Sequence, residues 1–133
     1  MADVAQDVAD LLATASVGST SAPVTIFNGH LPSGPDDALM VRAIGGSAPV
    51  RRMGTSLAAP VRDRPDVQVW IRNATYPAMQ TKIAAVLSAL DFYRGTIAGK
   101  AYFIELAYEP IDMGIDENNR FQTSMVFHIV RER

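Results

Sequence analysis

Cysteine is absent from this 133-residue chain, and only two histidines and one tryptophan occur. Without thiols the chain can form no disulfide scaffold, no zinc–thiolate cluster and no cysteine nucleophile. Long apolar runs are missing too, since none approaches the ~20 residues that cross a bilayer. The acidic start, MADVAQDVADLL, lacks the basic and apolar parts of a signal peptide. We therefore expect a soluble protein without a membrane partner.

Charge is nearly balanced over the whole chain but unevenly distributed along it. Twelve basic and fourteen acidic residues give a net charge of −2, and 48% of the residues are hydrophobic, which suits a single folded domain over residues 1–133. Residues 1–37 contain five Asp and no Lys or Arg, whereas residues 38–65 contain five Arg and one Asp. An acidic and a basic element can attract each other or the opposite element of a neighbouring molecule. The alternative is two solvated faces that never meet.

Two segments carry apolar residues at the spacing i, i+4, i+7, i+8 and i+11, which predicts two amphipathic helices. The first runs from Val4 to Ala15 with Asp3 as its cap, and the second runs from Thr75 to Leu90 with Pro77 in its first turn. The first helix carries three acids off its apolar stripe, which predicts an acidic face that meets a neighbouring subunit: Asp3, Asp7 and Asp10.

Strands are expected where apolar and polar residues alternate, in five segments: residues 24–27, 38–44, 66–72, 101–108 and 121–130. If the two helices packed their apolar faces on each other, both faces of the sheet would remain exposed. The pattern therefore predicts an α+β fold with a single mixed, largely antiparallel sheet of about five strands and both helices on one face. The other face, with Trp70, Arg72, Gln122 and Ser124, then needs water or a partner.

Periodicity disappears between Gly45 and Arg64, which predicts an extended loop between the second and third strands. A loop of about 20 residues is unusual in a compact domain and is usually functional. Its arginines are candidates for assembly contacts or for contact with DNA phosphates: Arg51, Arg52, Arg62 and Arg64. The loop has no aromatic residue for base stacking, and pairing of an arginine with Asp63 or Asp66 in its own subunit is the alternative.

No motif for catalysis or metal binding is present in the sequence. Neither His30 nor His128 is tied to a nucleophile, and no G-x-S-x-G elbow or phosphate loop occurs. The oxygen-rich segment 112–118, with Asp112, Asp116, Glu117 and Asn118, lacks the spacing of an EF-hand and predicts a polar hairpin loop. We expect no catalytic residue, no metal and no cofactor, which leaves binding or assembly as the leading class.

Three segments together resemble a known family: IFNGHLPSGPDDALMVRAIGG, RPDVQVWIRNATYPAM and PIDMGIDENNRFQTSMVFHIVRER. They are similar to the tail terminator proteins of long-tailed bacteriophages, often catalogued as minor capsid proteins. The resemblance runs from the first helix to the C-terminus. One departure is visible, because similar proteins often have a glycine soon after the second helix, where this chain has Asp91-Phe92.

The resemblance implies a non-enzymatic virion protein of the tail and neck, assembled in the host cytoplasm. It implies a homo-oligomeric ring, usually a hexamer, on the head-proximal end of the tail tube, which stops tube polymerisation and joins the tail to the head connector or stopper. Its partners would be itself, the tube protein and the connector, with passive contact to genomic DNA in the channel. The alternatives are another neck ring, such as a stopper or adaptor, or a small α/β hydrolase or ligand-binding domain with a site near Asp112, Asp116 and His128.

Overall fold

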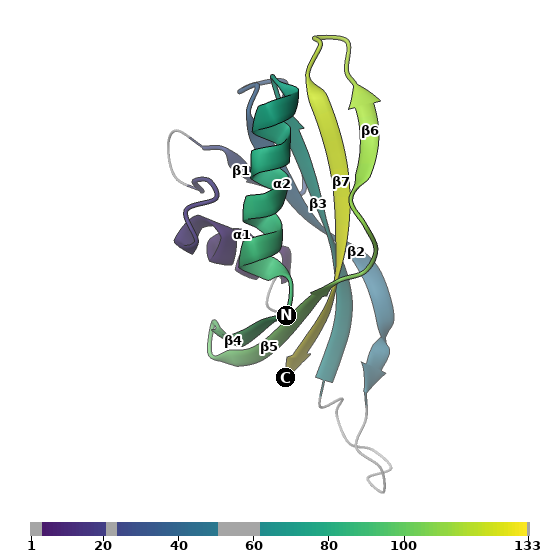
Figure 1. Ribbon diagram of the computed structural model, residues 1–133. Coiled ribbons are helices and arrows are strands. Elements are labelled where there is room, and N and C mark those ends of the chain that lie inside the picture. Colours follow the sequence, from purple (N-terminus) through teal and green to yellow (C-terminus); the bar gives the residue numbers. More distant parts are fainter. Residues whose placement is uncertain (1–3, 21–23, 51–61, 133) are drawn as a thin grey trace, which may run out of the picture.

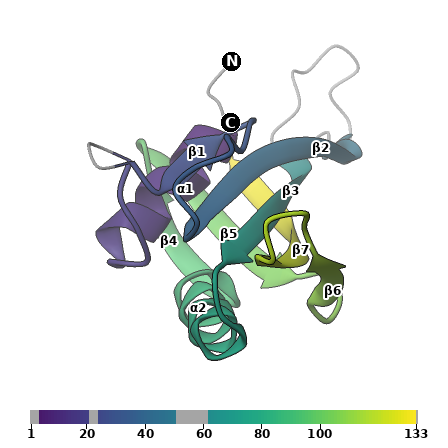
Figure 2. The ribbon, with the colours of Figure 1, turned by 90° about the horizontal axis from the view of Figure 1, so that it is seen from above.

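A curled, mixed sheet forms a half-barrel with two helices packed against one of its faces (Figures 1 and 2). The computed structural model describes residues 4–20, 24–50 and 62–132. In this part of the chain the elements are α1 (Val4–Thr14), β1 (Ile26–Asn28), β2 (Ala38–Val50), β3 (Arg62–Asn73), α2 (Tyr76–Leu90), β4 (Tyr93–Ile97), β5 (Lys100–Leu106), β6 (Ile111–Ile115) and β7 (Phe121–Glu132). No helix among them is long and apolar enough to cross a membrane.

The sheet has the strand order β1-β2-β3-β7-β5-β4, and β6 pairs with the part of β7 that β5 leaves uncovered. Every pairing is antiparallel except that of β1 with β2. The predicted α+β class and the largely antiparallel mixed sheet are therefore confirmed. The number of strands was wrong, because the described chain has seven and not five.

Both helices lie where their apolar stripes predict. Val8 and Leu12 of α1 and Val86 and Leu90 of α2 are buried in one core with the inward residues of the sheet. Thr75 caps α2 as expected, and its Oγ1 accepts a hydrogen bond from Ala78 N at 3.4 Å. The four central strands supply the opposite wall of the core, with alternate residues buried: Leu39 and Val41, Val67 and Val69, Met125 and Phe127, and Tyr102 and Ile104.

The expected loop between Gly45 and Arg64 was wrong at both of its ends. Residues 45–50 continue β2 and residues 62–64 begin β3, so the two strands form a long hairpin that extends past the helices (Figure 1). The pairing is interrupted by two register shifts, one between Ala43 and Gly46 and one between Ser47 and Val50. Gly45 and Gly46, at the first shift, have φ of 108° and 121°. A Cβ on Gly46 would lie 2.3 Å from the Arg64 carbonyl oxygen, so this bulge requires glycine. Residues 51–61, with Arg51 and Arg52, lie outside the described part of the chain.

Two strands of five residues each were missed, and neither has a fully buried residue. β4 is exposed at its three central residues, and all five residues of β6 are exposed. The turn between α2 and β4 contains the departure noted in the sequence. Phe92 adopts φ of 58°, a left-handed conformation that favours glycine after a helix, and its side chain is 70% exposed.

Candidate functional site

The residues considered for a hydrolytic site are not brought together. His128 lies near the C-terminal end of β7, where its Nδ1 is 2.7 Å from Asp66 Oδ1. Asp116 lies beyond the other end of β7, next to Ile115, which pairs with Phe121. Phe121 and His128 are seven positions apart, or roughly 23 Å along a strand. His30 is exposed in a different segment, and the described residues contain no group of three or more His, Cys, Asp or Glu that could hold a metal ion.

The predicted polar hairpin loop at 112–118 is only partly right, because residues 116–118 lie in the connection between β6 and β7 but residues 112–115 belong to β6. Asp116 Oδ1 accepts hydrogen bonds from the backbone N–H groups of Asn118 and Arg120, each at 2.9 Å. Desolvation raises the pKa of this carboxyl, but the two N–H donors and the Arg120 side chain outweigh that effect and lower the pKa below its ordinary value. Asp112 Oδ1 similarly accepts from Gly114 N at 2.8 Å. These carboxylates stabilise a turn.

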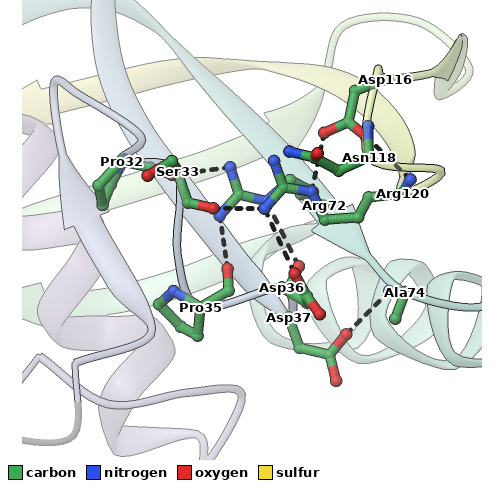
Figure 3. A network of polar contacts seen from close by, with 10 residues as sticks. All are labelled: Pro32, Ser33, Pro35, Asp36, Asp37, Arg72, Ala74, Asp116, Asn118 and Arg120. Atoms are coloured by element: carbon green, nitrogen blue, oxygen red, sulfur yellow. Dashed lines mark hydrogen bonds and ion pairs between the residues drawn. The ribbon is translucent and has the colours of Figure 1, made fainter.

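Two buried arginines hold the segment before β2 against one end of the sheet (Figure 3). Arg72 of β3 donates to the carbonyl oxygens of Pro32, at 2.8 Å, and Pro35. Arg120 donates to Asp116 Oδ2 at 2.8 Å and to the carbonyl oxygen of Ser33. Burial and the nearby positive charge of Arg120 lower the pKa of Arg72.

The expectation that Arg72 needs water or a partner protein was therefore wrong. Its guanidinium is covered by the chain's own residues 32–36, with Asp36 contributing a carbonyl oxygen at 3.4 Å. Ser124 is buried as well. This end of the outer sheet face is thus closed within one subunit.

A second buried polar network joins α1 to the distal part of the long hairpin. The Tyr102 hydroxyl of β5 donates to Asp7 Oδ2 and accepts from Arg131 of β7, and Arg131 Nη2 donates to Asp63 Oδ2 of β3 at 2.8 Å. Burial and the hydrogen bond to Asp7 raise the pKa of Tyr102 to about 12. Burial lowers the pKa of Arg131, but Asp63 and Tyr102 more than offset this, and the pKa lies above its ordinary value.

This network corrects the expected acidic face of the first helix. Asp7 is buried against Tyr102, so it is not available to a neighbouring subunit. Asp10 is exposed and accepts from Gln6 Nε2 at 2.9 Å, and Asp3 lies outside the described residues. The sequence pattern placed Asp7 on an acidic face, because it could not show that a tyrosine 95 positions later would cover it.

The distal part of the long hairpin is basic and exposed. We call residues 42–50 of β2 and 62–66 of β3 the hairpin arm. Arg42, Arg62 and Arg64 are exposed, as is the apolar side chain of Ile44. The arm extends past the helices in Figure 1. Arg62 and Arg64 thus lie on a strand and not in the expected loop, on a surface that can meet another protein.

A second exposed surface lies around β6 and was missed by the sequence analysis. We call residues 109–117 the β6 strip. Its strand exposes the apolar side chains of Ile111, Met113 and Ile115, and exposed Glu109 and Glu117 flank them. An adjoining groove of about 310 Å³ lies between α2 and β6. The alternation of Ile111, Met113 and Ile115 with Asp112 and Gly114 was the available signal.

Comparison with known proteins identifies the family of this chain. The profile of the bacteriophage tail terminator protein family matches residues 7–133. A solved chain of the virion of a native gene transfer agent particle is 16% identical, with a TM-score of 0.55 over 99% of this chain and 87% of that one. A second solved structure is 10% identical, with a TM-score of 0.61 over 98% of both chains. No curated protein matches the sequence significantly. The chain belongs to the bacteriophage tail terminator protein family, and is a structural protein of the phage tail.

Proposed function

We propose that six copies of this chain form a ring that caps the head-proximal end of the tail tube, ends tube polymerisation and joins the tail to the head connector. The family match over residues 7–133 carries this proposal. The fold is compatible with it, because the hairpin arm and the β6 strip are two unlike exposed surfaces on different strands. A ring built from head-to-tail contacts needs two different patches on each subunit.

The arginines between residues 51 and 64 are candidates for contacts within this ring or with its channel. We propose that Arg51, Arg52, Arg62 and Arg64 contact an acidic surface of a neighbouring subunit or the phosphates of DNA in the channel. Arg62 and Arg64 are exposed. Asp63 and Asp66 are engaged by Arg131 and His128. Pairing of a loop arginine with either acid in its own subunit is the alternative.

The proposed function is tested in a phage that lacks this protein and receives it from a plasmid. Without the plasmid, we expect tails of irregular or excessive length, or tails that fail to join heads, in negative-stain electron micrographs. With wild-type protein supplied, tail length becomes uniform and heads attach. Uniform, head-joined tails in the absence of the protein would contradict the capping role.

Purified protein gives a second test that does not depend on infection. Mixed with tube protein, the chain should form rings at one end of each tube and reduce mean tube length as its concentration rises. A chain that remains monomeric and leaves tube length unchanged at every ratio would refute both ring formation and capping.

A further inference from the structure

Part of the edge of β2 has no partner strand in the described chain. β1 pairs only with Leu39–Val41, and the arm continues beyond it. On this side Leu39 N–H donates to the Thr25 carbonyl at 2.9 Å, and the Val41 carbonyl accepts from Gly29 N–H at 2.8 Å. Because backbone groups alternate along a strand, the N–H and C=O of Ala43 also face this edge. Beyond Val41, therefore, the arm offers unpaired strand backbone.

The outer edge of β6 is a second strand edge without a described partner, because β6 pairs with β7 alone. Asp116 N–H faces β7, where it donates to the Arg120 carbonyl at 2.9 Å. By the same alternation, the N–H and C=O of Ile115 face outward. An exposed edge that also carries apolar side chains is a surface to which another strand readily adds.

β4 forms a third edge of the sheet, and charge distinguishes it from β6. The hairpin arm exposes Arg42, Arg62 and Arg64, and the hairpin of β4 and β5 carries Arg94 and Lys100 of the same sign. The β6 strip instead exposes Glu109 and Glu117. Like charges across a contact disfavour it and opposite charges favour it, so the arm is complementary to β6 and not to β4.

We propose that β2 of one subunit's hairpin arm adds to β6 of the next subunit, so that the sheets continue from subunit to subunit around the ring. Backbone hydrogen bonds would join the two edges, Ile44 would add to the apolar surface of the β6 strip, and the arm's arginines would face Glu109 and Glu117. This inference rests on the proposed ring. Because β3 and β7 separate β2 from β6, the two edges of one subunit lie roughly 14 Å or more apart, and the contact forms only between copies.

The absence of cysteine from the chain makes cross-linking a direct test. Paired variants would carry Ala43→Cys or Ser47→Cys on the arm and Ile111→Cys, Met113→Cys or Ile115→Cys on β6. All of these side chains are exposed. A disulfide requires Cα atoms about 4.4–6.8 Å apart, so these pairs cannot close within one subunit. In rings oxidised before denaturation, we expect at least one arm–β6 pair to give a reducible ladder of covalent multimers up to the closed ring.

The matched control places the second cysteine on β4, as Thr96→Cys, with the same arm cysteines. Thr96 is also exposed on an edge strand, so it tests whether any exposed cysteine would react. We expect no ladder from the β4 pairs. Rings that cross-link through β4, or that give no ladder from any of the six β6 pairs, would overturn the edge pairing and leave the capping function intact. A chain that forms no ring, alone or on tubes, would overturn the capping function as well.

Charge reversal gives an independent test that identifies the two surfaces. One variant carries Arg42→Glu with Arg62→Glu, and the other carries Glu109→Lys with Glu117→Lys. Each variant alone should form at least tenfold fewer rings at low salt, because the arm of one copy and the β6 strip of the next copy now carry charge of the same sign. A mixture should restore rings in which the variants alternate. Failure of the mixture to restore rings, with each variant folded by circular dichroism, would refute the proposed pairing.

Discussion

The buried network around Tyr102 gives the sharpest test of the packing of α1 on the sheet. Tyr102→Phe removes the hydroxyl that donates to Asp7 and accepts from Arg131, without changing the ring that fills the core. Asp7 is buried, and a buried acceptor left without its donor costs about 1–3 kcal/mol. For a chain of this length, each kcal/mol lowers the melting temperature by roughly 4 °C. We expect Tyr102→Phe to melt about 4–12 °C below the wild type.

The pH dependence of the same variant tests the mechanism of this loss. Tyr102 has a pKa of about 12 in the folded protein against 10 in the unfolded chain, so its contribution is complete below pH 10 and is lost as pH rises toward 12. At about 1.36 kcal/mol per pKa unit, the wild type loses up to about 2.7 kcal/mol over this interval through Tyr102. The phenylalanine variant lacks this loss, so the difference in unfolding free energy between the two proteins should shrink above pH 10.

The assay is urea unfolding followed by circular dichroism at intervals from pH 7 to pH 11.5. Tyr108→Phe is the matched control, because Tyr108 is exposed and its change should stay within about 0.5 kcal/mol. Asp7→Asn combined with Tyr102→Phe should cost less than the sum of the single changes, since both remove one interaction. A Tyr102→Phe variant as stable as the control, or a difference that does not shrink above pH 10, would refute the reasoning.

Three further predictions concern local structure, each measured by thermal melting at pH 7. Phe92→Gly should raise the melting temperature by a few degrees, because glycine relieves a left-handed φ of 58° at the end of α2; a lower value would show that the phenyl ring is needed for packing. Gly46→Ala should destabilise the protein more than Gly45→Ala, because both have positive φ but only Gly46 would bring its Cβ against the Arg64 carbonyl oxygen; equal melting points would contradict this. Arg120→Ala should cost about 1.5–3 kcal/mol, since it removes the hydrogen bonds of a buried guanidinium to Asp116 and to the Ser33 carbonyl oxygen, and a loss below about 0.5 kcal/mol would disprove the clamp.

The centre of the fold was predictable from the sequence because buried residues recur at regular spacings along a helix or a strand. The helical stripes that contain Val8 and Val86 and the alternation at Val67 and Phe127 all identify buried positions correctly. The cap at Thr75 was equally predictable, because its side chain acts on a backbone group three residues away. These features depend on neighbours along the chain or on one common core.

The two buried polar networks were not predictable in the same way. Asp7 reaches Tyr102 across 95 positions, and Arg120 reaches Ser33 across 87. A single sequence shows the acids and the bases but not which of them meet. The charge asymmetry between residues 1–37 and 38–65 therefore suggested an acidic helix face, whereas burial removes Asp7 from the surface.

The remaining errors all concern edge strands, which also bear on the proposed ring. A strand covered on one face alternates between apolar and polar residues, but an edge strand exposed on both faces need not do so. The distal part of β2 is such an edge, and a glycine bulge interrupts it further. β6 does alternate, at Ile111, Met113 and Ile115, and β4 packs Tyr93 and Ile97 against the core, but each of these strands is only five residues long and has no buried residue. Within a single subunit the apolar residues of β6 have no core to face, so their pattern has no explanation in the isolated fold. A strand from a neighbouring copy would explain the pattern, because the contact between copies would then cover Ile111, Met113 and Ile115.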